Sequence, residues 1–360
     1  MNLYGFKKFF LKKRKTDCSQ NRLPDIHHFV AHFVPPSSAV DNVCIVTRPS
    51  YDNIQTLRKG ETVGICDFHT HSTASDGRLT PTELVDEAAR CGLQGYAISD
   101  HDTLAGVEEA SARAAELGLY YIPAVELSVN LHIGGSAHLL GYFPGADLSV
   151  LCNPASEMQK ALQFVVDGRN TRNPAIVQKF RDLGFDISME EVEAEAGDAV
   201  VGRPHIASVL VKKGLVGSSE EVFGRYLGSG KPAYVERERL GDYRAIELIR
   251  QAGGLPVIAH PKYIQVAGLQ ELGALVASLV DAGLAGLETY YPEQSKELIA
   301  FLEKTAEKRG LLLTGGSDFH GIKHPLPGWC DGSFGVDTDK VSDFISECRR
   351  REGITNGKTQ

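Results

Sequence analysis

The sequence predicts an α/β fold in which short strands alternate with helices, and three observations support this prediction. Seven β-prone apolar runs follow one another from residue 62 onward, with helical segments between several of them. Histidines and acids stand at the ends of most of these runs. A long stretch of mostly helical composition separates the fourth run from the fifth. We therefore expect a closed parallel barrel, one unit shorter than a TIM barrel, with a helical insertion.

The seven runs give the expected strands, which cover residues 62–68, 95–99, 120–127, 137–143, 255–260, 285–291 and 311–317. The clearest helix follows the first strand. Thr80 is expected to cap its N-terminus, Pro81 occupies the first helical position, Glu83 completes a capping box, and Gly92 ends it. The next helix is expected to end in the same way at Gly118, and the helix of residues 241–254 returns to the barrel pattern.

These elements divide the chain into parts. We expect an N-terminal extension, partly disordered, over residues 1–61, a barrel over 62–146 and 236–345, a helical insertion over 147–235, and a C-terminal tail over 346–360. The basic segment "MNLYGFKKFFLKKRK" is typical of a solvated tail, and a membrane-surface or targeting segment is the alternative.

Composition narrows the function classes. The chain has 360 residues and a net charge of −8, which argues against a broad basic face that binds duplex DNA. No apolar run reaches the roughly 18 residues of a transmembrane helix. The 7 cysteines form no C-x-x-C pair, which favours a reducing, cytoplasmic location over a disulfide framework. The oligomeric state stays open.

Metal-ligand residue types recur where the expected strands end. They are His69 and His71 after the first strand, Asp100, His101 and Asp102 after the second, Glu126 in the third, His260 after the fifth, and Asp318 and His320 after the seventh. His138 is the exception, because it stands near the start of the fourth run. Side chains at positions i and i+2 of a strand share a face, so the H-x-H pair presents two imidazoles together.

Imidazole and carboxylate ligands suit Zn, Mn or Fe ions, and this many groups are enough for more than one ion. Two or three ions about 3.5–4 Å apart hold a phosphoryl group for in-line displacement. A lone buried histidine is more often a core residue than a ligand. The recurrence of such residues at successive strand ends favours a metal centre.

The motifs "DFHTHSTASDG", "AISDHDT", "VELS", "IAHP" and "GSDFH" resemble those of the PHP superfamily, named for polymerase and histidinol phosphatase. The resemblance covers roughly residues 62–335 and implies a distorted (β/α)7 barrel that holds three divalent ions. Mn²⁺ is the expected ion, with Fe²⁺ or Zn²⁺ as alternatives. By resemblance, His69, His71 and Asp318 bind the first ion, Asp76, His101 and His320 the second, and His138 and His260 the third, while Glu126 bridges ions.

The chemistry of such ions predicts that a metal-bound water loses a proton near neutral pH and attacks phosphorus. Asp67, Asp100 and Asp102 are then expected to orient imidazoles. Asp102 could instead help to move a proton.

The insertion contains cationic motifs, "DGRNTRN", "VGRPHIA" and "GSGKPAYV". They offer Arg169, Asn170, Arg172, Arg203, His205 and Lys231 as candidate phosphate ligands. These segments resemble stand-alone PHP phosphoesterases, in which a helical insertion caps the C-terminal face of the barrel. That resemblance implies that the insertion binds a 5′-phosphate while the ions hold the neighbouring 3′-phosphate.

The expected activity is therefore hydrolysis of 5′-phosphorylated nucleotides, as a phosphatase of nucleoside 3′,5′-bisphosphates, as an exoribonuclease that trims short RNA from 5′ to 3′, or as both. The expected partners are a small nucleotide or a short 5′-phosphorylated RNA, because no long basic groove with interleaved aromatics is visible. The alternatives are a histidinol-phosphate phosphatase, a 3′ exonuclease associated with a polymerase, and a metal-bound scaffold without turnover.

Overall fold

The computed structural model describes residues 64–197, 199–321, 329 and 334–353. The expectations for the N-terminal extension, including its basic segment, lie outside these residues. The last part of the predicted C-terminal tail, residues 354–360, also lies outside them.

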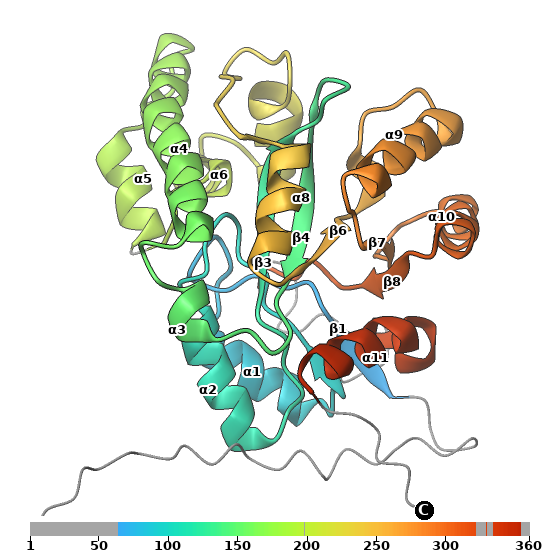
Figure 1. Ribbon diagram of the computed structural model, residues 1–360. Coiled ribbons are helices and arrows are strands. Elements are labelled where there is room, and N and C mark those ends of the chain that lie inside the picture. The colour runs from blue at the N-terminus through green and yellow to red at the C-terminus, as the bar shows by residue number, and fades with distance from the viewer. Residues whose placement is uncertain (1–63, 198, 322–328, 330–333, 354–360) are drawn as a thin grey trace, which may run out of the picture. The chain divides into compact units, whose positions relative to one another are not determined.

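The seven expected strands are all present (Figure 1). They are β1 (Ile65–Asp67), β2 (Gly95–Tyr96), β3 (Ala124–Asn130), β4 (Ser136–Tyr142), β6 (Leu255–Ile258), β7 (Gly286–Tyr290) and β8 (Leu312–Gly315). Two further short strands extend the sheets at their edges: β5 (Leu240–Gly241) pairs with β3, and β9 (Val336–Asp337) pairs with β1.

The strands form a distorted barrel from two sheets, with the orders β2-β1-β9 and β5-β3-β4-β6-β7-β8. Backbone hydrogen bonds join the sheets on both sides. The amide of Phe68, just after β1, donates to Gly315 at the end of β8 (3.1 Å), and the amide of Tyr96 in β2 donates to Tyr120 just before β3 (2.9 Å). The predicted fold class is therefore confirmed.

One strand runs against the prediction of an all-parallel barrel. β4 is antiparallel to both of its neighbours, β3 and β6. Its first residues therefore lie beside the last residues of the neighbouring strands, with His138 opposite Ser128. This direction explains why His138, near the start of its strand, shares the end of the barrel with the other candidate ligands.

Helices lie outside the strands (Figure 1). They are α1 (Pro81–Arg90), α2 (Val107–Leu117), α8 (Asp242–Gln251), α9 (Leu269–Asp281), α10 (Lys296–Arg309) and α11 (Ser342–Arg351), with 3-10 turns η2 (Pro261–Tyr263) and η3 (Thr338–Val341). The predicted capping box is present: the Thr80 side chain accepts from the amide of Glu83, and the Glu83 carboxylate accepts from the amide of Thr80. Gly118 ends α2 in the left-handed conformation, as expected.

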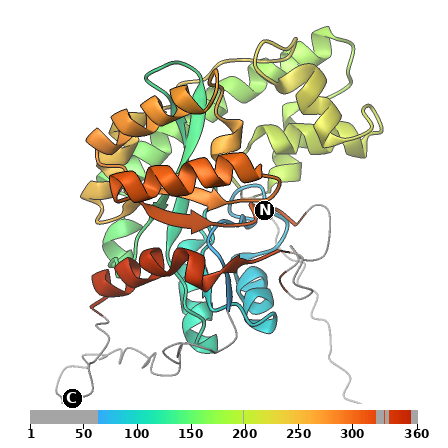
Figure 2. The ribbon, with the colours of Figure 1, turned by 90° about the vertical axis from the view of Figure 1, so that its right-hand side faces the viewer.

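The region between β4 and β5 is helical. It comprises α3 (Leu148–Leu151), α4 (Glu157–Asp182), α5 (Met189–Ala196), α6 (Arg203–Lys212), α7 (Ser219–Val222) and a π-helical turn η1 (Phe223–Leu227). The second half of α4 packs with α5, α6 and α7 around a separate core that includes Ile176, Phe180, Ile206 and Leu210. These helices gather to one side of the strands in Figure 2, whereas α11 lies on the other side. The assignment of 147–235 as one domain stays a prediction.

The C-terminal helix differs from the expected boundary, because α11 continues to Arg351 and the predicted tail began at residue 346. Phe344 and Cys348 on its inner face are fully buried. The Phe344 ring lies 5.1 Å from that of Phe68 and 4.9 Å from that of Tyr142. This amphipathic helix therefore closes one side of the barrel core.

Within the described residues, no helix has the length and apolar character needed to cross a membrane. Cys66, Cys152 and Cys348 carry free thiols, whereas Cys91 is disulfide-bonded. A bonded cysteine is not a disulfide framework, but it weakens the argument from cysteine usage for a reducing compartment.

Substitution of Phe344 by Ala tests the role of α11 in the core. Removal of a fully buried phenylalanine leaves a cavity, and we expect the free energy of unfolding to fall by about 3–5 kcal/mol in chemical denaturation. Phe164, on α4, is 43% exposed and gives the control, because Phe164→Ala should change stability by less than about 0.5 kcal/mol. Equal effects of the two substitutions would show that α11 is not part of the barrel core.

Candidate metal centre and arginine cluster

The end of β1 carries the first candidate ligands, His69 and His71, both fully buried. This segment runs directly beside the end of β8, where the amide of Asp318 donates to the carbonyl of His69 (2.8 Å). The approach requires a glycine, since a Cβ added to Gly316 would lie 2.3 Å from the Cβ of His69. The glycine in "GSDFH" therefore brings the two ligand-bearing segments together.

Four of the predicted ligands form a first group, in which one potential ligand atom from each lies within 4.8 Å of the others: His69, His71, Glu126 and Asp318. Asp318 Oδ1 lies 3.3 Å from His69 Nε2 and 3.0 Å from His71 Nε2. Glu126 Oε1 lies 3.4 Å from His69 Nε2. The three residues expected to bind the first ion are thus brought together.

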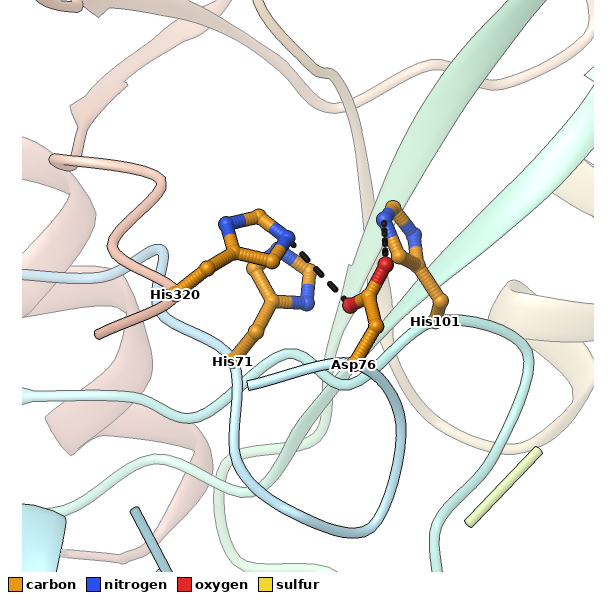
Figure 3. A group of neighbouring side chains, drawn as sticks. All are labelled: His71, Asp76, His101 and His320. Atoms are coloured by element: carbon orange, nitrogen blue, oxygen red, sulfur yellow. Dashed lines mark ion pairs between the residues drawn. The ribbon is translucent and has the colours of Figure 1, made fainter. Parts of the chain in front are cut away.

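A second group consists of His71, Asp76, His101 and His320 (Figure 3). The carboxylate of Asp76 lies between two imidazoles, with Oδ1 3.3 Å from His320 Nε2 and Oδ2 3.8 Å from His101 Nε2. The loops that follow β1, β2 and β8 supply these side chains. This group contains the three residues expected to bind the second ion.

The third group surrounds the other side of Glu126 and includes His101 and His138. His260 joins it, because its Nε2 lies 2.8 Å from Glu126 Oε1 and 3.3 Å from His138 Nδ1. Glu126 thus contacts imidazoles of all three groups, which is the arrangement expected of a bridging carboxylate.

The electrostatics of these groups fit divalent cations. Burial would raise the pKa of Asp76, but His101 and His320 outweigh it and hold that pKa well below its usual value. Burial, His320 and His101 together lower the pKa of His71 to about 3, so its imidazole is neutral. Several buried polar atoms have no hydrogen-bond partner, including both ring nitrogens of His71, Nε2 of His69 and Oε2 of Glu126. Divalent cations would satisfy these buried atoms, which belong to imidazole and carboxylate groups.

Two aspartates that were expected to orient imidazole rings, Asp67 and Asp100, accept hydrogen bonds from backbone amides instead. Asp67 accepts hydrogen bonds from the amides of His69 (3.1 Å) and Ser317 (3.0 Å) and from Trp329 Nε1 (2.8 Å). Asp100 accepts from the amide of Ser72 (2.7 Å) and the hydroxyl of Ser75 (2.6 Å). They therefore fix the loops that carry the ligands, whereas we expected them to orient imidazole rings.

Glu288, in β7, performs the role that the sequence analysis assigned to those aspartates. Its Oε1 lies 2.8 Å from His69 Nδ1, and its Oε2 accepts from the backbone amide of His260 (2.6 Å). Glu288 therefore turns Nε2 of His69 toward the cluster, as carboxylates that support metal-bound histidines do. The signal for it was an acid inside an apolar strand, "GLETYY".

Backbone strain is concentrated at this site. Three of the four non-glycine residues with positive φ in the described chain are Asp102 (55°), His260 (27°) and Asp318 (56°). Such conformations cost about 1–3 kcal/mol each and persist where surrounding contacts enforce them. The strain is consistent with side chains held in place for function.

Asp102 does not contact the imidazoles. Its buried carboxylate accepts from Arg169 Nε (3.0 Å) and Nη2, from Arg237 Nη2 (3.3 Å) and from the amide of Ser128 (2.7 Å). Burial would raise its pKa, but the two guanidinium groups outweigh burial and lower it. An aspartate held ionised in this way is a poor proton carrier, so the geometry favours a positioning role and disfavours proton transfer.

Five arginines form a cluster that includes the two partners of Asp102, and the other four act electrostatically on Arg172: Arg169, Arg172, Arg203, Arg237 and Arg239. Arg172 is 4% exposed, and its guanidinium donates to the Asn173 amide oxygen (2.7 Å). Burial, Arg169, Arg237 and the other arginines lower the pKa of Arg172 to about 8. The carboxylates that pair with members of this cluster are those of Asp102 and Glu236. The cluster therefore has excess positive charge, which an anion would stabilise.

The predicted substrate residues are only partly brought together. Arg169, Arg172 and Arg203 belong to the arginine cluster, and His205 interacts electrostatically with both Arg169 and Asp76. Asn170 and Lys231 are exposed, and their side chains make no hydrogen bond or ion pair with the cluster among the described residues. Neighbouring residues of a helix point about 100° apart, so Asn170 cannot share the face of Arg169 and Arg172.

Arg237 and Arg239 were not predicted. They lie in "VERERLGD", just before β5, where alternating charges are typical of an exposed loop. Arg239 Nη1 instead donates to Asn130 at the end of β3 (3.0 Å), and Arg237 is 7% exposed. Their position became visible only from the fold.

Comparison with known proteins identifies relatives of this chain. A 5′-3′ exoribonuclease of Haemophilus influenzae is 37% identical over 280 residues, which are 78% of this chain and 96% of that protein. A 3′,5′-nucleoside bisphosphate phosphatase of Chromobacterium violaceum is 32% identical and covers 79% of this chain and 93% of its own. The crystal structure of a protein described as a metal-dependent phosphoesterase, from Bifidobacterium adolescentis, matches with a TM-score of 0.67 and 30% identity, over 81% of this chain and 97% of that one.

The family model for the PHP domain matches residues 67–313. This range runs from the aspartate before the H-x-H pair to the last strand of the barrel, and thus includes most of the candidate metal ligands. With the resemblance in sequence, the barrel and the clustered ligands in agreement, the chain belongs to the PHP domain family.

Proposed function

We propose that the chain hydrolyses 5′-phosphorylated nucleotides, removing the 3′-phosphate of nucleoside 3′,5′-bisphosphates, trimming short RNA from 5′ to 3′, or both. The chain is a hydrolase that acts on phosphoester bonds. The observation that carries the finer proposal is the buried arginine cluster beside the metal centre, because it offers a second phosphate site next to the first.

Three divalent ions, Mn²⁺ by preference, are proposed for the three ligand groups. His69, His71 and Asp318 would hold one, Asp76, His101 and His320 a second, and His138 and His260 a third, with Glu126 between them. When bound, such ions polarise phosphoryl oxygens and lower the pKa of water enough to supply a nucleophile near neutral pH.

The protein's own contribution is to place the substrate. Arg169 and Arg237 are held by Asp102, so their guanidinium groups present donors at a fixed position. Arg172 and Arg203 add charge within the same cluster. A dianionic 5′-phosphate bound there would leave the 3′-phosphate of the same ribose directed to the metal centre. Fixed geometry of this kind lowers the entropic part of the barrier.

His205 is proposed to contribute between the two subsites. It caps the start of α6, where its Nδ1 accepts from the amide of Gly202 (3.0 Å). Its other ring nitrogen is therefore the protonated one in the neutral tautomer and is available to donate to a phosphate oxygen.

The arginine cluster and the ligand set both favour this function over its alternatives. Histidinol phosphate carries one phosphate and an amine, so five guanidinium groups beside the metal centre would have no second anion to bind. A scaffold without turnover does not require a strained and complete ligand set. A polymerase-associated exonuclease would have no use for a site that binds a terminal 5′-phosphate.

Metal content gives a first test that does not depend on activity. We expect about three Mn²⁺ ions per chain after loading and gel filtration, measured by inductively coupled plasma mass spectrometry. His260→Ala should lower the content by about one ion. His132→Ala is the matched control, because His132 pairs with Asp242 outside the three groups. Equal metal content in wild type and His260→Ala would contradict the third site.

Arg203→Ala tests recognition of the 5′-phosphate. Wild type should turn over 5′-phosphorylated RNA and adenosine 3′,5′-bisphosphate in Mn²⁺, and should cleave 5′-hydroxyl RNA poorly. Hydrogen bonds to charged groups contribute about 1.5–3 kcal/mol, so the variant should lose about ten-fold or more of the preference for a 5′-phosphate, expressed as the ratio of kcat/KM values.

Lys231→Ala is the control for this experiment, because Lys231 is an exposed cation of the same helical region with no contact to the arginine cluster among the described residues. It should retain the wild-type ratio. Equal cleavage of both RNA ends by wild type, without turnover of the bisphosphate, would overturn the proposed function. Turnover of histidinol phosphate instead would favour the first alternative.

A further inference from the structure

An exposed aromatic side chain lies at the edge of the metal centre. Tyr263 belongs to the 3-10 turn η2 that follows β6, three residues after His260, and its side chain is 57% exposed. Its ring centroid lies 5.3 Å from that of His260 and 6.0 Å from that of Tyr291. Both neighbours meet it at steep angles, 68° and 85°, so neither covers the ring by parallel stacking.

A lysine accompanies the two tyrosines. Lys262 Nζ lies 4.9 Å from the ring centroid of Tyr263 and 5.5 Å from that of Tyr291. It contacts the carboxylate of Glu293 (3.2 Å) and the carbonyl of Pro292 (3.4 Å), which keep the ammonium group beside the rings. Tyr291 in turn donates its hydroxyl hydrogen bond to Asp318 Oδ2 (2.8 Å). The tyrosine pair is thus connected directly to two candidate metal ligands.

The tyrosine pair and the arginine cluster lie beside different ligands of the metal centre. Arg169 contacts Asp102 and Ser128, and Ser128 lies opposite His138 in the β3–β4 pairing. His138 contacts His260, which contacts Tyr263. A chain of contacts therefore leads from the arginine cluster, across the third ligand group, to Tyr263.

We propose that Tyr263, flanked by Tyr291 and Lys262, stacks on the base of the nucleotide downstream of the scissile phosphate. This inference rests on the proposed function, which places the 5′-phosphate at the arginines and the 3′-phosphate at the metal centre. A substrate held in this way extends away from the arginines, past His260. The site therefore accepts a dinucleotide or short RNA, in addition to a nucleoside bisphosphate that ends at the 3′-phosphate.

Chemistry and contacts both favour a nucleobase. An exposed ring face offers stacking to any base, because every base has a π-face, and a nearby cation offers contact to the next phosphate. In the reaction, water adds to phosphorus and the P–O3′ bond breaks. The O3′ of the first nucleotide takes the proton, while the phosphate stays on the 5′-oxygen of the downstream nucleoside. That nucleoside must lie beyond the metal centre during the step, on the side opposite the held 5′-phosphate.

Substrate comparison tests the inference in the full chain loaded with Mn²⁺. The measured quantity is the kcat/KM for 5′-phosphorylated diadenosine divided by the kcat/KM for adenosine 3′,5′-bisphosphate. Tyr263→Ala should lower this ratio by about ten-fold, since stacking on a base is worth one to two orders of magnitude in binding, and Tyr263→Phe should restore it. Tyr243→Ala is the matched control, because Tyr243 is a 42% exposed tyrosine that packs on His132, which belongs to none of the three ligand groups, and it should retain the ratio.

Two results would overturn the inference. An unchanged ratio in Tyr263→Ala would show that no downstream base is stacked there. A parallel loss of kcat/KM for both substrates, with lowered Mn²⁺ content, would show that Tyr263 only supports His260.

A spectroscopic measurement separates this inference from the proposed function. A 5′-phosphorylated dinucleotide with 2-aminopurine as its downstream base, and with a methylene group in place of the scissile O3′, is titrated with the Mn²⁺-loaded chain, so that binding is measured without turnover. Quenching that is present in wild type and Tyr263→Phe but lost in Tyr263→Ala supports stacking, even if wild type hydrolyses neither substrate and the proposed function fails. Quenching that is absent, or is equal in Tyr263→Ala and wild type, contradicts stacking.

Discussion

The arrangement of the site depends on the buried carboxylate of Asp102. It pairs with Arg169 of α4 and with Arg237 before β5, and it lies directly after His101, a candidate metal ligand. A buried ion pair is weak evidence for stability but fixes geometry well, because breaking it leaves an uncompensated charge. Through this contact the helical region between β4 and β5 is attached to the end of the barrel that carries the candidate metal ligands. The spacing between arginines and metal ligands is thereby set by one side chain.

The metal centre depends on a second feature, the gathering of imidazole groups around the carboxylate of Glu126. Imidazoles from β1, β2, β4 and β6 approach this carboxylate, and several of their nitrogens have no hydrogen-bond partner. The surrounding fold holds His260 and Asp318 in strained backbone conformations. Gly316 lets the segment after β8 approach the segment after β1, and Glu288 orients the ring of His69. Cations would satisfy these unpartnered atoms, so folding and metal binding are expected to be coupled.

Much of this arrangement is visible in the sequence, for identifiable reasons. The strands were predictable because β-prone apolar runs bounded by turns have a clear signature. Most candidate ligands were predictable because they recur at strand ends, whereas Asp76 and the grouping of the ligands came from the resemblance to the PHP motifs. The direction of β4 was not predictable, since a strand has the same alternation in either direction. Arg237 and Arg239 resembled an exposed charged loop, because burial by distant segments leaves no local signal. Glu288 did leave a signal, an acid inside an apolar strand, but nothing in the sequence placed it beside His69. The basic end of α11 likewise resembled a tail, although Cys348 is buried.

The central claim is that arginines and metal ligands hold two neighbouring phosphates of one nucleotide. A crystal structure of the Mn²⁺-loaded chain with adenosine 5′-monophosphate, the proposed product, tests it most directly. We expect the 5′-phosphate within hydrogen-bond distance of Arg169, Arg172 or Arg203 and the 3′-hydroxyl directed to the ions. A 5′-phosphate bound to the ions themselves, with no anion at the arginines, would contradict the claim.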